Sequence, residues 1–254
     1  MLRKRIIPFL LIDKNGDCIK TVSFSDRQYV GDILNNIRIF NEKEADEIVV
    51  LDIDITKKKY EPNFEIISKI ASVCRMPLTY GGGVKDVNTA KKIINLGVEK
   101  ICLNSSVLSN INLVEEMAKE LGSQSVSVCL NFKKINNNYF IVSNTGYETK
   151  LNFLDYLKKL QDNGVGEIIF NSYNDEGTMR GYDFDFLEKV NKYLKVPSII
   201  LGGCSDYENI KKLFKLFPNF ASGCSSIFIY KGKLKAVLIN YPSENKKNEI
   251  LNNS

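Results

Sequence analysis

The chain of 254 residues contains no histidine. This absence excludes Ser-His-Asp and Cys-His catalytic mechanisms within the chain, and it excludes metal sites built from histidine. Six cysteines are scattered with no C-x-x-C pair, so zinc ribbons and redox dithiols have no support. We expect reduced, mostly buried thiols, and neither a metal nor a cofactor.

Long apolar runs and a strong charge are also missing. Runs such as Ile6–Ile12 and Val196–Leu201 are far shorter than the roughly 20 residues that a membrane span needs. The first run ends at Asp13 without a cleavage site, so we interpret it as a strand and the protein as cytosolic, without a membrane partner. The net charge is only +5, and the basic residues are interleaved with acidic ones. This pattern does not support a nucleic-acid partner. The low-complexity end, 243–254, predicts a flexible tail.

The chain repeats itself at an offset of 120 residues. Pro77-Leu-Thr-Tyr-Gly-Gly-Gly-Val-Lys-Asp86 corresponds to Pro197-Ser-Ile-Ile-Leu-Gly-Gly-Cys-Ser-Asp206. The same ungapped offset pairs Ser105-Ser106 with Ser225-Ser226. Internal repeats indicate duplicated architecture, so two similar halves are expected.

Each half, about 1–120 and 121–242, alternates short apolar runs with amphipathic ones. The expected strands are Ile6–Ile12, Glu47–Ile53, Pro77–Tyr80, Lys100–Leu103, Ser125–Asn131, Glu167–Asn171, Pro197–Leu201 and Ser226–Tyr230. Helical patterns between them include Asp32–Lys43, Phe64–Ser72, Val87–Leu96 and Leu113–Glu120.

Continuous apolar strands joined by helices are typical of a buried parallel sheet. Four strand–helix units in each half predict a single (β/α)8 TIM barrel over 1–242. An open sheet of six to eight strands is the alternative, but it gives no reason for a twofold repeat. Pro8 lies inside the first strand, where its missing N–H predicts a local irregularity.

Ligands of such a barrel bind at the C-terminal ends of its strands. Gly81-Gly82-Gly83 follows the third strand and Asn104-Ser105-Ser106 the fourth. In the second half, Gly202-Gly203 follows the seventh strand, and Gly223-Cys224-Ser225-Ser226 leads into the eighth. Glycine lets backbone N–H groups approach phosphate closely, so we predict two phosphate sites on opposite sides of one mouth, with plain turns as the alternative. We infer from the two sites a substrate with a phosphate at each end.

Several short segments together are specific to one family. They are Lys4-Arg5-Ile6-Ile7, Leu51-Asp52-Ile53, Gly81-Gly82-Gly83, Gly97-Val-Glu-Lys100, Leu121-Gly-Ser-Gln-Ser-Val126, Gly166-Glu167-Ile168, Gly177-Thr178 and Gly181-Tyr182-Asp183. Over roughly 1–230 the chain resembles the cyclase subunit of imidazole glycerol phosphate synthase. The resemblance implies a (β/α)8 barrel that receives ammonia from a glutaminase subunit at its N-terminal face and works on a substrate with two phosphates. The candidate phosphate-binding residues are Gly82, Gly83, Asn104 and Ser105 at one end, and Gly177, Thr178, Gly202, Gly203, Ser225 and Ser226 at the other.

The resemblance fails at the catalytic pair. The family carries one aspartate at the end of strand 1 and another at the end of strand 5, as general acid and base, and here these positions are Leu11 and Asn131. The 120-residue offset pairs the same two positions. Neither side chain can transfer a proton, and losing one such group costs on the order of 10²–10⁴ in rate. Asp13, two residues beyond Leu11, is the candidate substitute.

The residues that the family uses to gate ammonia are present. By the resemblance, Arg5, Glu47, Lys100 and Glu167 form a ring of two acidic and two basic residues at the bottom of the barrel. A solvated rim is the alternative. Because a lone charge pointing inward at a strand start would be costly, a mutually paired ring is the better interpretation.

A chain that keeps the gate but lacks both carboxylates resembles the branch of this family that works with a glutaminase and a sugar amidotransferase. That branch supplies ammonia for acetamidino groups on surface-polysaccharide or flagellar sugars. Asp52-Ile53-Asp54 followed by Thr56-Lys57, and the closing Val237-Leu-Ile-Asn-Tyr-Pro242, agree with it.

Three hypotheses therefore stand. The first is an ammonia-channelling subunit of a glutamine-dependent system that amidinates a sugar. The second is a working imidazole glycerol phosphate cyclase of histidine biosynthesis. The third is a non-catalytic barrel that only stabilises or activates its glutaminase.

Overall fold

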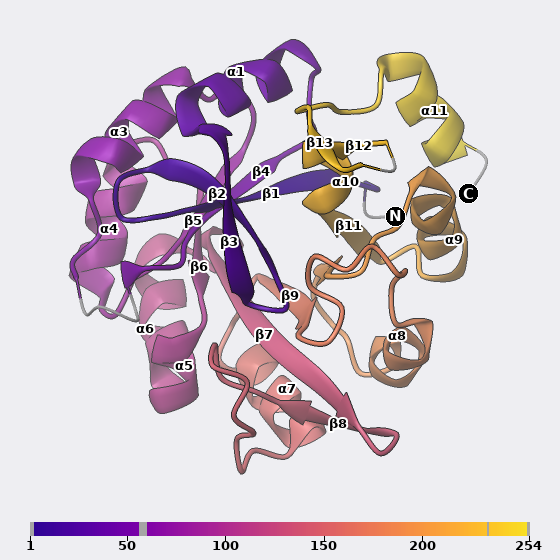
Figure 1. Cartoon of the computed structure of the whole chain (residues 1–254). Coiled ribbons are helices and arrows are strands. Elements are labelled where there is room, and N and C mark those ends of the chain that lie inside the picture. The colour runs from indigo at the N-terminus through magenta and orange to yellow at the C-terminus, as the bar shows by residue number, and fades with distance from the viewer. Residues whose placement is uncertain (1–2, 56–59, 233, 253–254) are drawn as a thin grey trace.

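Eight parallel strands close into a barrel (Figure 1). A computed structural model describes residues 3–55, 60–232 and 234–252. The barrel strands are β1 (Ile6–Ile12), β4 (Ile48–Asp52), β5 (Leu78–Gly81), β6 (Lys100–Leu103), β7 (Val126–Ile135), β9 (Glu167–Ser172), β10 (Ser198–Leu201) and β11 (Phe220–Cys224). Parallel pairing of β1 with β11, which begins at Ile6 and Ser222, closes the cylinder. The predicted (β/α)8 fold is confirmed.

Helices cover the outside of the barrel. The long ones are α1 (Ile33–Glu42), α3 (Phe64–Val73), α4 (Val87–Asn95), α6 (Asn112–Leu121), α7 (Phe153–Asp162), α8 (Phe184–Asn191) and α9 (Tyr207–Leu216). Asp86 and Asp206, a pair of the 120-residue repeat, are the N-caps of α4 and α9, where each side chain accepts an N–H of the first turn. Among the described residues, no helix is long and apolar enough to span a lipid bilayer.

The eighth strand lies earlier in the sequence than predicted. The expected strand Ser226–Tyr230 was wrong, because Ser226–Ile229 forms the short helix α10 after β11. Its apolar run is buried against the core as a helical turn, and a short apolar run does not distinguish a strand from a buried helix. Applying the 120-residue offset to β6 would have located β11, as it relates α5 (Ser105–Ser109) to α10.

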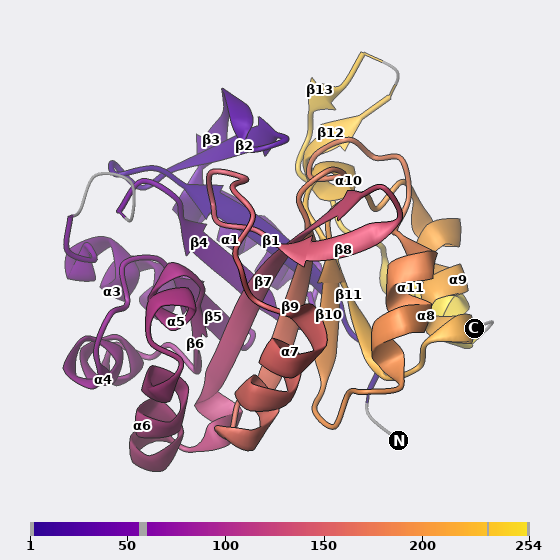
Figure 2. The same ribbon diagram turned by 90° about the horizontal axis from the view of Figure 1, so that it is seen from below.

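Additional strands extend above the C-terminal ends of the barrel strands. They are the hairpin of β2 (Asp17–Val22) and β3 (Ser25–Asp32), strand β8 (Asn138–Ile141) paired with β7, and the pair β12 (Tyr230–Lys231) and β13 (Ala236–Val237). Figure 2 shows β2, β3, β12 and β13 on the same side of the barrel. These elements surround the barrel mouth. A 3-10 turn, η1 (Ser123–Ser125), precedes β7.

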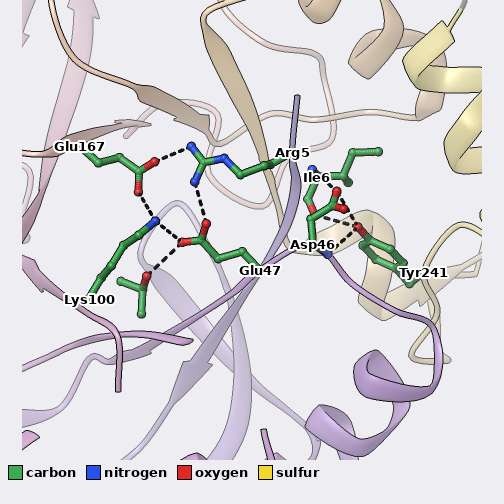
Figure 3. Close-up of polar contacts among 8 residues, drawn as sticks. Arg5, Ile6, Asp46, Glu47, Lys100, Glu167 and Tyr241 are labelled. Carbon is green, nitrogen blue, oxygen red and sulfur yellow. Dashed lines mark hydrogen bonds and ion pairs between the residues drawn. The ribbon is translucent and has the colours of Figure 1, made fainter. Parts of the chain in front are cut away.

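The end of the described chain is a helix, α11 (Glu244–Asn252), in place of the flexible tail expected from its composition. Ile250 is fully buried, and Lys247 contacts Asp46 at 3.2 Å. The hydroxyl of Tyr241 donates to the carbonyl of Ile6 at 2.8 Å, just before this helix (Figure 3). Contacts distant in sequence therefore order a segment whose own composition is polar.

The sheet is regular at Pro8, where an irregularity was expected. Pairing with β11 runs without a shift from Ile6 to Pro8, and pairing with β4 begins at Phe9. The proline thus lies where the β4 ladder starts, a position at which a missing N–H is tolerated.

Candidate functional site

Four charged side chains form a closed ring at the N-terminal end of the barrel (Figure 3). The Arg5 guanidinium contacts Glu47 at 2.7 Å and Glu167 at 2.5 Å. The Lys100 ammonium contacts the same two carboxylates, at 2.8 and 3.1 Å. Each anion therefore touches both cations. The side chains of Glu47 and Glu167 are only 3% and 6% exposed, so the structure contains the paired ring and not a solvated rim.

The ring is electrically balanced, which allows it to be buried. Burial by itself would lower the pKa of Arg5, but the Glu167 and Glu47 carboxylates outweigh it and raise that pKa. The Thr79 hydroxyl donates a further hydrogen bond to Glu47 at 3.1 Å. Two positive and two negative charges leave no net charge at the barrel axis.

An apolar layer lies between this ring and the barrel mouth. Alternate residues of each strand point inward, so the residues that follow the ring at two-residue spacing form a second buried cluster inside the cylinder. Its members are Ile7, Phe9, Val49, Cys102, Cys129, Ile169, Ile199, Leu201 and Ala221. All six cysteines of the chain are free, and five of them are buried. A layer of this kind disfavours charged species and favours small neutral ones.

A cavity of about 560 Å³ opens above the apolar layer, at the C-terminal ends of the strands. Six of the candidate residues line it, namely Leu11, Gly82, Gly83, Asn104, Ser105 and Asn131. The structure thus brings together one predicted phosphate set and both degenerate catalytic positions. A cavity of this size is large enough for a small-molecule ligand.

The glycine turn after β5 permits the close approach of two strand ends. Gly82 and Gly83 have φ of 134° and 67°. A Cβ on Gly82 would lie 2.7 Å from the backbone oxygen of Asp52, and one on Gly83 would lie 2.3 Å from Ile55 Cγ2. Only glycine fits these positions without displacement of the neighbouring atoms.

At the two degenerate positions the structure places no proton-transferring group. Leu11 is apolar, and the Asn131 amide donates to Asn144 at 2.8 Å and accepts from Asn171 at 3.0 Å. Asp13, the candidate substitute, is held within its own turn. Its carboxylate accepts the backbone N–H groups of two residues of its own turn and is not part of the described cavity lining.

One acidic residue that does line the cavity is Asp52, at the end of β4. Burial raises its pKa to about 6, against the opposing effect of hydrogen bonds from the N–H groups of Asp54 and Ile55. Asp52 was not among the site residues expected from the sequence. The available signal was an acidic residue at the C-terminal end of a buried strand. Thr56 and Lys57 of the same motif lie outside the described residues.

The second predicted phosphate set lines a separate, narrow cleft of about 30 Å³. The cleft contains Gly177, Gly202, Gly203, Ser225 and Ser226. Thr178 lies beside it, and its hydroxyl donates to the carbonyl of Asp175 at 2.9 Å. Ser225 Oγ is buried without a hydrogen-bond partner. The two sets of residues therefore lie in separate recesses of very different size.

A buried ion pair that was not expected from the sequence lines the narrow cleft. Lys20, on β2, is 2% exposed and pairs with Glu176, which lines both recesses. Phe24 stacks on Tyr173 with ring centroids 4.4 Å apart. The β2–β3 hairpin is thereby held against the loop after β9. Lys20 lies in a hairpin outside the barrel, and nothing in the local sequence indicates that its side chain is buried.

Comparison with known proteins identifies relatives along nearly the whole chain. A family model described as "Histidine biosynthesis protein" matches residues 5–234. A relative from Leptospira borgpetersenii, named "Putative imidazole glycerol phosphate synthase subunit HisF", is 45% identical over 253 residues, covering 98% of this chain and 99% of the relative. A relative from Vibrio vulnificus strain YJ016, "Putative imidazole glycerol phosphate synthase subunit hisF3", is 42% identical over 255 residues, or 99% and 97% of the two chains. "Imidazole glycerol phosphate synthase subunit HisF" of Saccharolobus solfataricus is 33% identical over 229 residues, or 90% and 91%.

Proposed function

This chain belongs to the histidine biosynthesis protein family as a HisF-like synthase subunit, and from that membership we propose that it is an ammonia-channelling barrel. It receives ammonia from a glutaminase subunit bound at its N-terminal face. The ammonia passes along the barrel axis and leaves through the cavity, for amidination of a surface-polysaccharide or flagellar sugar.

The observation that carries this proposal is the contrast between the two ends of the barrel. The ring of Arg5, Glu47, Lys100 and Glu167 is complete, with every contact between 2.5 and 3.1 Å. The apolar layer above it favours a neutral molecule such as ammonia over ammonium, because a charge is costly to desolvate. At the other end, the two acid–base positions hold a leucine and an amide.

Loss of both proton-transferring groups argues that the chemistry on the acceptor has moved elsewhere. Each group contributes on the order of 10²–10⁴ in rate, so a barrel lacking both would be a poor cyclase. We infer that the acceptor is activated on a third protein, a sugar amidotransferase. The large cavity with its glycine turn at Gly82 and Gly83 then binds a phosphorylated or sugar ligand at the outlet.

The test is a coupling assay on the full chain reconstituted with its glutaminase and the amidotransferase. Amide-¹⁵N-labelled glutamine is supplied in medium containing unlabelled ammonium, and the ¹⁵N fraction of the amidinated product is measured. Lys100→Met should lower that fraction while glutamine is still hydrolysed, because the gate no longer directs ammonia inward. Lys119→Met, which removes a surface partner of Glu115, should leave the fraction unchanged. Equal ¹⁵N fractions in the Lys100→Met variant and the wild type would reject channelling and favour a barrel that only activates its glutaminase.

A second candidate function, the imidazole glycerol phosphate cyclase reaction, is favoured by one observation. Asp52 lines the cavity with a pKa of about 6, which suits a general acid or base near neutral pH. The purified chain with ammonia and the bisphosphate substrate would then form the imidazole product, and Asp52→Asn would abolish it. Turnover of that kind would promote this function over sugar amidination.

A further inference from the structure

Five polar side chains that line the cavity form one continuous hydrogen-bond relay. Asn171 Nδ2 donates to Asn131 Oδ1 at 3.0 Å, and Asn131 Nδ2 donates to Asn144 Oδ1 at 2.8 Å. Asn144 Nδ2 donates to the Ser105 hydroxyl at 2.9 Å, and that hydroxyl donates to Asn104 Oδ1 at 3.3 Å. The relay contains no charged group.

The backbone sets the orientation of the amide at the far end of the relay. Asn104 Nδ2 donates at 2.6 Å to the carbonyl oxygen of Cys129, and a backbone carbonyl can only accept. Asn104 therefore presents its Oδ1 to Ser105, whose hydroxyl donates to that oxygen and accepts from Asn144 Nδ2. With the Ser105 hydroxyl in this orientation, Asn144 and Asn131 each accept through Oδ1, and Asn171 is bonded through its Nδ2.

The relay therefore ends at Asn171 Oδ1, an acceptor that receives no hydrogen bond. Asn171 Oδ1 is buried and has no hydrogen-bond partner, while Asn171 as a whole is 6% exposed and lines the cavity. An unpaired buried acceptor is unfavourable by about 1–3 kcal/mol. Such a group is explained by a ligand that brings an N–H or O–H to it.

The position of Asn171 on β9 indicates where that ligand comes from. Glu167, Ile169 and Asn171 alternate along one strand, so all three point to the barrel axis. Glu167 belongs to the charged ring and Ile169 to the apolar layer. Asn171 lies roughly 13 Å beyond Glu167 along the strand, and is the first polar group of β9 above the apolar layer.

We propose that Asn171 Oδ1 is the receiving site for neutral ammonia at the point where ammonia leaves the axial passage. That ammonia is the hydrogen-bond donor here rests on the proposed channelling function. Ammonia supplies the missing N–H, and its lone pair remains free for the acceptor. A neutral amide suits this role because a carboxylate would retain ammonium through charge attraction. Asn131, which is hydrogen-bonded to Asn171, is likewise neutral and stands where the family has an aspartate.

The proposal is tested by NMR titration of the purified full chain with ammonium chloride, at a pH high enough to supply neutral ammonia. The reporter is the side-chain amide of Asn131, which is bonded directly to Asn171. Tetramethylammonium chloride at the same concentration and pH controls for ionic strength, since it has no N–H. We expect a saturable shift with ammonia that is absent with tetramethylammonium. In Asn171→Leu the apparent affinity should fall at least about tenfold, or about 1.4 kcal/mol.

A matched control is Asn191→Leu, because Asn191 also has a buried, unpartnered Oδ1 but lies outside the described cavity lining. That variant should titrate like the wild type. No saturable shift in the wild type, or unchanged affinity in Asn171→Leu, overturns the proposal. If Asn171→Leu does not fold, the shift of the Asn171 side-chain amide in the wild type decides alone.

Two further outcomes are separable. A saturable shift with N-acetylglucosamine but none with ammonia would assign Asn171 to a hydroxyl or amide entering from the mouth, and would overturn the ammonia site. The titration uses no glutaminase, so it can succeed even where the Lys100→Met coupling assay rejects channelling. Failure of the site and failure of the channel are thus distinguished.

Discussion

Replacing Glu167 by glutamine removes one charge from the basal ring while nearly preserving the shape of the side chain. Glu167 contacts two cations, Arg5 at 2.5 Å and Lys100 at 3.1 Å, and is 6% exposed. A glutamine can accept from one of them through its oxygen but turns its NH₂ group toward the other. The ring then carries a net charge of +1 inside the barrel.

The expected cost follows from the burial of the partners. Breaking a buried ion pair by removing one member typically costs 3–5 kcal/mol. Here Arg5 and Lys100 are 21% and 19% exposed, so water can solvate part of the surplus charge. We therefore expect Glu167→Gln to lower the free energy of unfolding by about 2–4 kcal/mol.

A double variant separates loss of charge balance from loss of packing. Glu167→Gln with Lys100→Gln leaves Arg5 paired with Glu47 at 2.7 Å and restores neutrality. It should be more stable than the sum of the two single effects predicts, by about 1–3 kcal/mol. Urea unfolding followed by circular dichroism measures all three variants. Glu65→Gln, in an exposed pair with Lys69, is the control and should cause no measurable change.

Additive effects would refute this reasoning. If the double variant is as unstable as the sum of the single variants, the four charges do not act as a closed ring. The same conclusion holds if Glu167→Gln unfolds no more easily than the exposed control.

Asp52→Asn should be more stable than the wild type by about 1–3 kcal/mol at pH 8 and equal to it near pH 4. Burial raises the pKa of Asp52 from 3.8 to about 6, so the stability of the wild type falls as pH rises through that window. Denaturation at a series of pH values checks this, and parallel stability profiles of the two proteins would contradict it. Gly83→Ala should weaken inorganic phosphate binding at least tenfold by calorimetry and lower stability by about 1–3 kcal/mol, since its Cβ would lie 2.3 Å from a side-chain carbon. Gly232→Ala is the control for backbone strain without a clash, because φ there is 73° with nothing within 4 Å. Lys20→Met leaves Glu176 without its buried cation, so amide hydrogen exchange in the β2–β3 hairpin should quicken; unchanged exchange would show that the ion pair does not hold the hairpin.

The fold was predictable because local and global signals agree. The 120-residue repeat, the apolar strands and the aspartate caps at Asp86 and Asp206 all indicate a duplicated barrel. The eighth strand was misplaced because the apolar residues of α10 follow β11 within two residues, and periodicity cannot separate them. Helix α11 was missed because its order depends on Ile250 and Lys247 contacting distant parts of the chain.

The candidate site was predictable only in part. The glycine turns could be located from the repeat, and the ring and the two degenerate positions from the resemblance to the family, because strand ends and strand starts have fixed places in a barrel. The relay could not, since Asn144 enters it from a loop between β8 and α7 whose path no local pattern specifies. The buried pairing of Lys20 with Glu176, across 156 residues, was equally invisible.

The sequence by itself determined the architecture and which residue types face the axis, because alternation along a strand is a local property that the repeat confirms twice. Only the tertiary structure decided the electrostatic state of those residues. Whether Glu167 is paired, whether Asp52 holds its proton near pH 6 and whether Asn171 keeps an open acceptor depend on groups that closure of the barrel brings together. Hydrogen bonds and desolvation act over a few ångströms in space, and the distance between residues in sequence does not specify them.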